Sequence, residues 1–145
     1  MLVRLLYASR TVEAIDQAFL KSIQEQSRAS NLEHGITGIL CAHPQGGVFI
    51  QVLEGGREAV NRLFGNIVRD QRHSDVTIVD YAEIEERRFA GWRMGNVDLN
   101  KVNRSSILRY SERGELDPFS MSGRSALALL EELVSSAAIG SYEGS

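Results

Sequence analysis

Apolar residues fill both faces of the stretch at residues 48–55, which reads VFIQVLEG. Successive side chains of a strand point to opposite faces, so this pattern predicts a strand in a sheet that is covered on both sides. The exception is Gln51, whose amide shares a face with Phe49 and Leu53. An unpaired buried polar group costs roughly 1–3 kcal/mol, so the amide needs a partner. Gln51 is either a structural glutamine bonded to backbone or a group that binds an edge offering both a donor and an acceptor.

The N-terminal stretch at residues 2–9, LVRLLYAS, alternates in a similar way and predicts another strand. Its Tyr7 lies on one face with apolar neighbours, so the phenol points into a core and needs a partner there. Apolar residues at helical spacing follow, and they predict a helix over about 11–27 with Thr11 as its N-cap. Asn31 lies in the polar connection after this helix, where turn chemistry is the ordinary interpretation.

The remaining chain predicts three more strands and three more helices. The strands are expected at residues 36–43, 76–84 and 91–97, and the helices at about 57–70, 102–108 and 122–138. The turn at residues 44–47, PQGG, predicts a hairpin between the second and third strands. In the last strand, Trp92 and Met94 share one face. Gly38 lies inside the second strand, which often marks a close approach of backbone or ligand.

This order, βαββαββ, predicts an α+β fold of the ferredoxin-like sandwich type. The sheet is expected to be mixed and five-stranded, with two helices on one face and the C-terminal helices on the other. We therefore expect a sheet-and-helix domain over residues 1–98 and a helical extension over residues 99–145 that packs on the sheet.

Composition narrows the classes of function. The 145 residues are 43% hydrophobic, as in one small globular domain, and the net charge is −3 with scattered basic residues. These values give no electrostatic case for nucleic acid or an acidic membrane. A single cysteine fits a reducing cytoplasm. No apolar run approaches the roughly 20 residues of a membrane span, and the N-terminus does not resemble a signal peptide, so we expect a cytoplasmic protein.

Familiar catalytic and metal-binding patterns are absent from the sequence. Cys41 and His43 share a strand face, but no second pair stands at ligand spacing, so we predict no metal site. The chain also lacks a nucleophile elbow and a glycine-rich phosphate loop with its lysine. Hydrogen-bonding residues aimed into an apolar core are the feature that remains.

Five motifs carry these residues in a fixed order. They are LLYAS with Tyr7, Asn31 before GITGIL, FIQVLEG with Gln51, RDQRH after the second predicted helix, and GWRM with Trp92 and Met94. Together they resemble the BLUF domain, a blue-light sensor that uses flavin, over about residues 1–98. Five linked motifs are far more specific than any one of them.

The resemblance implies a flavin between the two helices of the domain, usually FAD, with FMN or riboflavin as alternatives. Ile23 and Ile67 match the side chains that flank the ring, and Asn31 matches the amide that bonds its pyrimidine edge. The positions that contact the ribityl and phosphate portion are matched by Asp70, Arg72 and His73. The photoactive pair is matched by Tyr7 and Gln51, with Trp92 or Met94 beside it.

Elementary chemistry agrees with this interpretation. An excited flavin is a strong one-electron oxidant, and a buried phenol such as Tyr7 can supply an electron and a proton. The amide of Gln51 can pass the proton on and then rotate or tautomerise, two alternatives that differ only in hydrogen positions. The altered hydrogen bonds would shift the flavin absorption slightly to the red.

The sequence therefore predicts a blue-light photoreceptor and not an enzyme. Because no cyclase, phosphodiesterase or DNA-binding segment is attached, we expect the signal to pass through the fifth strand and C-terminal helices to a separate signalling protein. We also expect a homo-oligomer, with neither nucleic acid nor membrane as a partner. The alternatives are a small flavin-dependent oxidoreductase and a flavin-free ferredoxin-like interaction domain.

Overall fold

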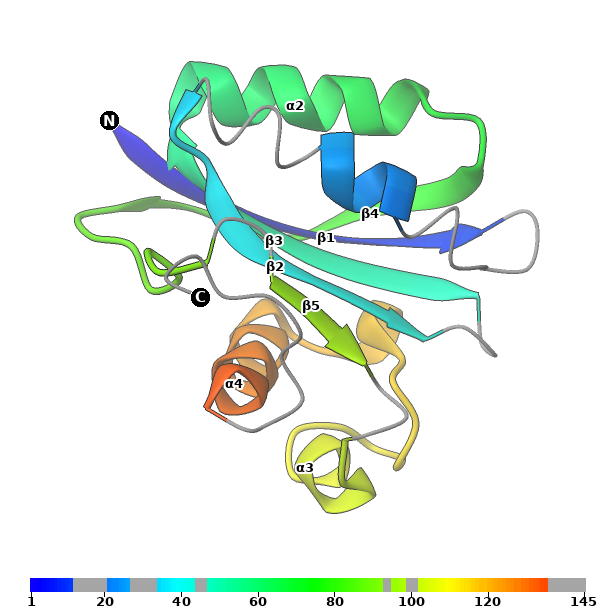
Figure 1. Cartoon of the computed structure of the whole chain (residues 1–145). Coiled ribbons are helices and arrows are strands. Elements are labelled where there is room, and N and C mark those ends of the chain that lie inside the picture. The colour runs from blue at the N-terminus through cyan, green and yellow to red at the C-terminus, as the bar shows by residue number, and fades with distance from the viewer. Residues whose placement is uncertain (12–20, 27–33, 44–46, 93–94, 99–101, 136–145) are drawn as a thin grey trace.

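A five-stranded sheet forms the centre of the molecule (Figure 1). The computed structural model describes residues 1–11, 21–26, 34–43, 47–92, 95–98 and 102–135. The strand order is β4-β1-β3-β2-β5, in which the first four strands are antiparallel and β5 pairs in parallel with β2. The strands are β1 (Leu2–Thr11), β2 (Thr37–His43), β3 (Val48–Gly56), β4 (His73–Ile84) and β5 (Gly95–Asp98). The predicted α+β class is confirmed.

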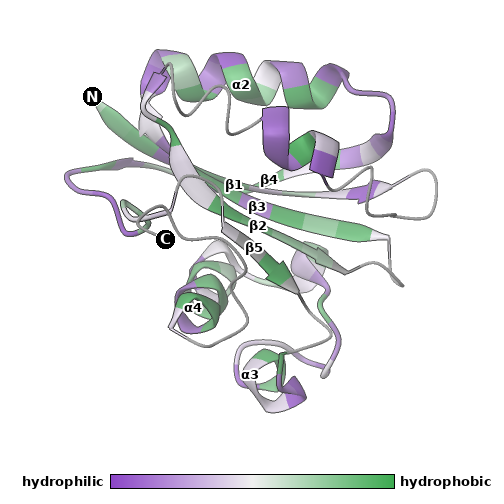
Figure 2. Ribbon diagram, viewed as in Figure 1, coloured by the Kyte–Doolittle hydropathy of each residue, from purple (hydrophilic) through white to green (hydrophobic). Residues whose placement is uncertain are grey.

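Helices lie on both faces of the sheet (Figure 1). On one face lie α2 (Arg57–Arg69) and the helical residues 21–26. On the other face lie α3 (Arg104–Leu108), the short 3-10 helix η2 (Pro118–Ser120) and α4 (Gly123–Val134). In Figure 2, hydrophobic and hydrophilic residues mix along α2 and α4, as expected for helices with one buried face.

Each helix buries an apolar stripe at helical spacing. In α2 the buried residues are Val60, Leu63 and Ile67, and in α4 they are Ala126, Leu129, Leu130 and Leu133. The α4 helix begins after Ser122, whose side chain accepts a hydrogen bond from the backbone N–H of Ser125. Packing of these stripes on the sheet separates the interior into two apolar clusters.

The alternation of β1 and β3 assigns their side chains to these clusters as the sequence predicted. The α2-side cluster contains Val3, Leu5, Tyr7, Ile23, Ile36, Leu40, Ala42, Phe49, Leu53, Val60, Leu63 and Ile67. The α4-side cluster contains Leu6, Ile39, Cys41, Ile50, Val52, Phe89, Val97, Ile107, Leu116, Ala126, Leu129, Leu130 and Leu133. The central strands β1 and β3 are therefore covered on both faces, whereas the edge strand β4 is largely exposed.

Backbone pairing corrects several predicted boundaries. Thr11 does not cap a helix, because it ends β1, where it pairs with His73 and its N–H donates to Gly47 O over 2.8 Å. Because His73 and Ser74 pair with β1, β4 begins at His73 and not at residue 76. The predicted strand at 91–97 is shorter, since Trp92 N–H donates to Phe89 O in a turn and β5 starts at Gly95.

Other boundaries are decided only in part. Residues 21–26 confirm the helical character of the first predicted helix, and the rest of that helix lies outside the described residues. The same holds for most of the predicted hairpin turn at 44–47, of which Gly47 is described with a positive φ of 63°. The last helix ends at Val134 with Ser135 as its C-cap, and the predicted extension to 138 lies beyond the described part.

Candidate functional site

Tyr7 and Gln51 form a buried polar pair at the centre of the sheet. They stand opposite each other on β1 and β3, and the Tyr7 hydroxyl donates a hydrogen bond of 2.5 Å to Gln51 Oε1. Tyr7 is 1% exposed and Gln51 is fully buried. The two residues lie within the α2-side cluster, where the Phe64 ring is 5.5 Å from the Tyr7 ring, centroid to centroid. The amide that the sequence singled out thus has the phenol as a partner.

The surroundings of Tyr7 keep its phenol protonated. Burial raises the pKa of Tyr7 above its ordinary value, and the negative charge of Asp70 adds to the increase. A neutral phenol can donate its proton to the amide oxygen, which a phenolate cannot do. The pair is therefore poised with the proton on the Tyr7 side.

Asp70 and Arg72 form a charged clamp directly after α2. The Arg72 guanidinium donates to both oxygens of the Asp70 carboxylate, with distances of 2.9 Å from Nε to Oδ1 and 2.6 Å from Nη2 to Oδ2. Hydrogen bonds from Arg72 lower the pKa of Asp70 below its usual range. Arg72 Nη1 also donates to the hydroxyl of Ser22 over 3.0 Å. A cation thus joins α2 to the helical residues 21–26.

His73, the first residue of β4, is buried and bonded through both ring nitrogens. Nδ1 lies 2.9 Å from Ser9 Oγ, and Nε2 lies 2.7 Å from Ile67 O. The ring also meets the Phe49 ring edge-on, with centroids 6.4 Å apart. The histidine is therefore held by protein atoms on β1 and α2.

The structure brings together most of the residues that the sequence singled out. Ile23 and Ile67 are buried in the same cluster as Tyr7. Asn31 and Met94 lie outside the described residues. Of the two candidates beside the photoactive pair, Trp92 is half-buried and packs against the α4-side cluster. Its carbonyl accepts a hydrogen bond from Gly38 N–H over 2.9 Å, which holds it beside β2.

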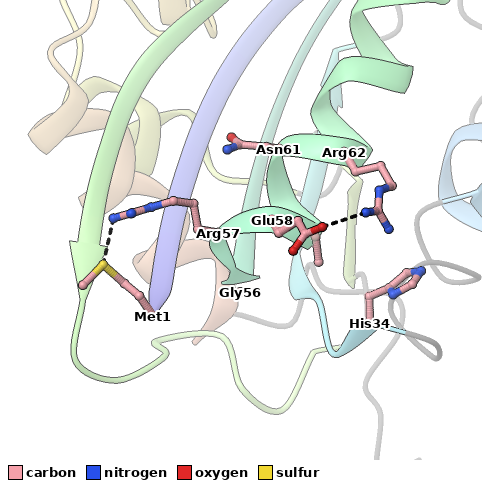
Figure 3. A pocket seen from close by; sticks show the side chains of 8 residues that line it. Met1, His34, Gly56, Arg57, Glu58, Asn61 and Arg62 are labelled. Carbon is pink, nitrogen blue, oxygen red and sulfur yellow. Dashed lines mark hydrogen bonds and ion pairs between the residues drawn. The ribbon is translucent and has the colours of Figure 1, made fainter.

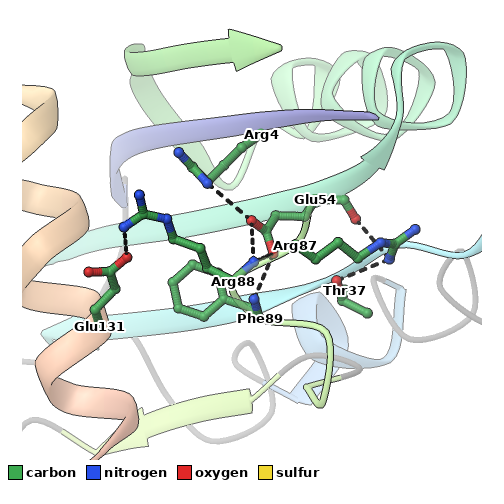
Figure 4. Close-up of polar contacts among 7 residues, drawn as sticks. All are labelled: Arg4, Thr37, Glu54, Arg87, Arg88, Phe89 and Glu131. Carbon is green, nitrogen blue, oxygen red and sulfur yellow. Dashed lines mark hydrogen bonds and ion pairs between the residues drawn. The ribbon is translucent and has the colours of Figure 1, made fainter. Parts of the chain in front are cut away.

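Sequence reasoning missed a second polar centre, which Figure 4 shows around Glu54. Glu54 is fully buried on β3, and its carboxylate accepts hydrogen bonds from Arg4 Nη1 (3.3 Å) and from the backbone N–H groups of Arg88 (3.1 Å) and Phe89 (2.8 Å). The signal was present, because an acidic residue at the end of an otherwise apolar strand must be paired if it is buried.

The loop between β4 and β5 connects this centre to α4. We call residues 85–92 the 85–92 loop. Within it, Arg87 donates to the Thr37 hydroxyl over 3.1 Å, and the guanidinium of Arg88 pairs with Glu131 on α4. Phe89 is buried among α4-side residues. The loop thus contacts β2, β3 and α4 at once.

A separate cleft of about 800 Å³ lies at the N-terminus of α2 (Figure 3). Its charged side chains are paired with neighbours. Arg62 donates to Glu58 over 3.0 Å, and Arg57 pairs with Glu83 and lies 2.8 Å from Met1 Sδ. The residues that line it include none of the site residues proposed from the sequence. We assign it no ligand.

The part of the chain that the structure describes bears on two further features, metal-ligand groups and membrane-spanning helices. Within it, no three His, Cys, Asp or Glu side chains form a group that could hold a metal ion. Burial raises the pKa of the Cys41 thiol to about 12, which disfavours the thiolate needed for metal binding. No helix among the described residues is long and apolar enough to cross a membrane.

Comparison with known proteins identifies the family. Residues 2–95 match the BLUF family, described as sensors of blue-light using FAD. The photoactivated adenylate cyclase subunit alpha of Euglena gracilis is 40% identical over 88 residues, which are 61% of this chain and 8% of that protein. The match to the beta subunit of the same organism covers 10% of that protein. This chain thus spans about a tenth or less of the length of these cyclase subunits.

Two solved structures match nearly the whole chain. The photo-activated state of BlsA is 30% identical, with a TM-score of 0.83, and the match covers 97% of this chain and 100% of that one. The dark-state structure of BlrB, a BLUF protein, is 34% identical, with a TM-score of 0.71 and coverage of 92% and 94%. The sequence-based resemblance is confirmed, and the chain belongs to the BLUF family of blue-light sensors that use flavin.

Proposed function

We propose that this BLUF photoreceptor holds a flavin between α2 and the helical residues 21–26, with Tyr7 and Gln51 as its photoactive pair. The observation that carries the proposal is the 2.5 Å hydrogen bond between the Tyr7 hydroxyl and Gln51 Oε1 inside an apolar cluster. A phenol and an amide that only stabilised the fold could be replaced by apolar residues at little cost. Placed under two helices, they are positioned to change hydrogen bonds on illumination.

The residues at this site fit a flavin by their chemistry. Ile23 and Ile67 supply buried apolar walls for a ring, and the Gln51 amide offers both a donor and an acceptor. Arg72, whose side chain is 42% exposed, can form charge-assisted hydrogen bonds with a phosphate, while Asp70 orients its guanidinium. We propose Asn31, outside the described residues, as the partner of the pyrimidine edge. The choice among FAD, FMN and riboflavin belongs to the same proposal, with FAD favoured.

Tyr7 and Gln51 carry out the protein's part of the chemistry. A bound flavin supplies a strong one-electron oxidant when it absorbs blue light. Tyr7 gives up an electron, and its proton leaves Oη along the hydrogen bond to Gln51 Oε1. On taking up this proton at Oε1, the amide would release one from Nε2 to the group that accepted the electron. Once an electron and a proton have returned to Tyr7, the amide would be left either rotated, with Oε1 and Nε2 exchanged, or as the imidic acid tautomer with a proton on Oε1. Both routes replace the acceptor that faced Tyr7 by a donor.

We propose that the change leaves the site through β3, the 85–92 loop and the C-terminal helices. Glu54 lies three residues after Gln51 on β3 and holds the backbone of this loop, while Arg88 joins the loop to Glu131 on α4. The packing of Trp92 on the α4 side favours a place for it in output and not beside the flavin. A role for Met94 next to Gln51 stays a prediction.

Several finer expectations remain proposals of ours. We propose a ferredoxin-like arrangement of five strands, supported by the order β4-β1-β3-β2-β5. We also propose a flavin-binding unit over residues 1–98 with a helical extension over 99–145, supported by the packing of α4 on the sheet. Cytoplasmic location, homo-oligomerisation, a role without catalysis and output to a separate partner stay predictions. Cyclase activity is a property of the Euglena relatives that this chain matches over a small part of their length.

The absorption spectrum before and after blue light tests the function. The purified protein should be yellow, and illumination should shift its flavin band slightly to the red, with recovery in the dark. Chromatography of the cofactor released by denaturation should then identify the flavin. A colourless protein that binds no added flavin would support the flavin-free interaction domain. A yellow protein with no reversible shift, but with bleaching on addition of a reduced nicotinamide, would support the oxidoreductase.

A further inference from the structure

The hydrogen bonds of His73 determine its tautomer. Nε2 lies 2.7 Å from the carbonyl oxygen of Ile67, and a carbonyl can only accept, so Nε2 must carry the proton. Nδ1, 2.9 Å from Ser9 Oγ, is then the acceptor of the neutral ring and receives the hydroxyl proton of Ser9. Ser9 is fully buried and His73 is 6% exposed. Both polar atoms of the ring are therefore engaged inside the protein.

The two partners of His73 lie on different elements, β1 and α2. Ser9 is two residues after Tyr7 on β1, where the pairing of β1 with β4 shifts register between Ala8 and Arg10. Ile67 is in the last turn of α2, and its carbonyl also accepts from Asp70 N–H over 3.1 Å. His73 thus ties the end of α2 to the strand that carries Tyr7.

We propose that His73 is a positioning residue and not a contact of the flavin phosphate. It holds Ile67, together with the adjacent clamp of Asp70 and Arg72, at a fixed place relative to Tyr7. A phosphate contact would require an N–H that is free to donate, whereas His73 donates its N–H to the backbone carbonyl of Ile67. The inference rests on the proposed flavin site, and it removes His73 from the set of phosphate contacts.

Binding of riboflavin and FMN to variants separates the two roles, because the two flavins differ only by the phosphate. His73→Phe keeps a ring but removes both hydrogen bonds, and Ser9→Ala removes one. We expect His73→Phe to weaken both flavins by the same factor, roughly five- to tenfold for the loss of buried hydrogen bonds. Ser9→Ala should weaken both equally and by a smaller factor. His73→Gln, which retains a donor near the Nε2 position, should restore part of the affinity.

Arg72→Ala is the matched contrast, since it removes the guanidinium but neither of the two hydrogen bonds of His73. It should weaken FMN about tenfold more than riboflavin, because charge-assisted bonds to phosphate are lost. The inference is overturned if His73→Phe gives this phosphate-selective pattern, or if Ser9→Ala leaves both affinities unchanged. Should His73→Phe fail to fold, Ser9→Ala and His73→Gln provide the same comparison.

Nitrogen NMR of His73 gives a readout that does not depend on flavin. In the neutral ring the ¹⁵N shifts should report a protonated Nε2 and an unprotonated Nδ1, and the proton on Nε2 should exchange slowly with water. Protonation at Nδ1 alone would overturn the inference even if flavin binds. If the wild-type protein bound no flavin but showed the expected tautomer, the proposed cofactor site would fail while the link between β1 and α2 would stand.

Discussion

Arg4 and Glu54 face each other across β1 and β3 as a buried ion pair, with Arg4 Nη1 3.3 Å from Glu54 Oε2. The Glu54 side chain is fully buried, and that of Arg4 is 9% exposed. The same carboxylate accepts two backbone hydrogen bonds from the 85–92 loop, at Arg88 and Phe89. Breaking a buried pair on one side leaves an uncompensated charge, so this pair fixes the loop on the sheet.

Glu54→Gln should therefore destabilise the protein strongly. The amide keeps one acceptor, but its NH₂ group would face donors in either orientation, and Arg4 would lose its counter-charge. Removal of one partner of a buried pair typically costs 3–5 kcal/mol, and we expect about 3 kcal/mol in the free energy of unfolding because part of the acceptor remains. Urea unfolding followed by circular dichroism would measure it.

The exposed pair on α2 provides the control. Glu58 accepts from Arg62 one turn away, and both side chains are largely exposed. Glu58→Gln should cost no more than about 0.5 kcal/mol, since exposed ion pairs contribute little. If both substitutions lowered the free energy of unfolding by the same amount, the buried Glu54 carboxylate would stabilise the protein no more than an exposed one.

We expect alanine to have opposite effects on thermal stability at two glycines that lie in helices. A Cβ at Gly123, the first residue of α4, would lie 2.8 Å from Asp80 Cβ and 2.9 Å from Val79 O, so α4 would have to move away from β4. At Gly65 in α2, a Cβ would meet only the Arg69 guanidinium, at 3.5 Å. Alanine favours a helix over glycine by about 0.8–1 kcal/mol. Gly65→Ala should thus raise the thermal midpoint, and Gly123→Ala should lower it.

Calorimetry of both variants measures these shifts. An increase in the midpoint for both would show that α4 can settle on β4 without the close approach at Gly123. A decrease for both would point to a requirement for glycine in α2 that the contacts of Gly65 do not explain.

The periodicity of the sequence predicted the secondary structure well where side chains decide it. Alternation along β1 and β3 correctly placed Tyr7 and Gln51 on one face and their neighbours on the other. The boundaries that failed are set by backbone pairing. Thr11 continues β1 because Gly47 and His73 supply partners for its backbone, and neither contact can be read from side-chain type.

The candidate site was likewise predictable where side-chain type marks it and not where backbone contacts decide it. A phenol and an amide inside apolar strands stand out in the sequence, and the register of β1 and β3 brings them together. The second polar centre was missed because the partners of Glu54 are a distant arginine and two backbone N–H groups. The sequence left the place of Trp92 open, because its backbone is held in the turn with Phe89, which ends before β5 begins.

The lowered pKa of Asp70 predicts how the free energy of unfolding depends on pH. Because hydrogen bonds from Arg72 lower its pKa in the folded protein, the clamp stabilises the fold above the unfolded pKa of about 3.9. This contribution is lost as the pH falls through the lower, folded value. We expect Asp70→Asn to be less stable than the wild type at pH 7, with the difference shrinking below about pH 4. Urea unfolding at several pH values would measure the difference in the free energy of unfolding between the two proteins. A difference that stays constant with pH would contradict a lowered pKa of Asp70.

Tyr7→Phe and Gln51→Leu separate flavin binding from photochemistry. Phenylalanine keeps the ring volume but lacks the hydroxyl proton, and leucine lacks the switching amide. Both variants should stay yellow and lose the reversible red shift. Because burial raises the pKa of Tyr7, the wild-type shift should keep its amplitude up to about pH 10, the ordinary pKa of tyrosine. A normal shift in either variant would remove that residue from the mechanism.

Arg88→Ala tests the proposed route of the signal to α4. The substitution removes the guanidinium that pairs with Glu131, but it keeps the backbone N–H that Glu54 accepts. Since α4 packs on the sheet face opposite Tyr7, the red shift should remain unchanged. Light-induced changes in amide hydrogen exchange of α4 should become smaller, because a signal must bias an element through a physical contact.

Arg109→Ala is the matched control for this experiment. Arg109 pairs with Glu132 on the same helix over 2.7 Å, but it comes from the end of α3 and not from the 85–92 loop. Each variant thus removes the arginine that pairs with one of two adjacent glutamates of α4, Glu131 or Glu132. If the loop carries the signal, Arg109→Ala should keep the full light response of α4 while Arg88→Ala reduces it. Equal responses in both variants would place the route elsewhere, with Met94→Ala as the next substitution to compare.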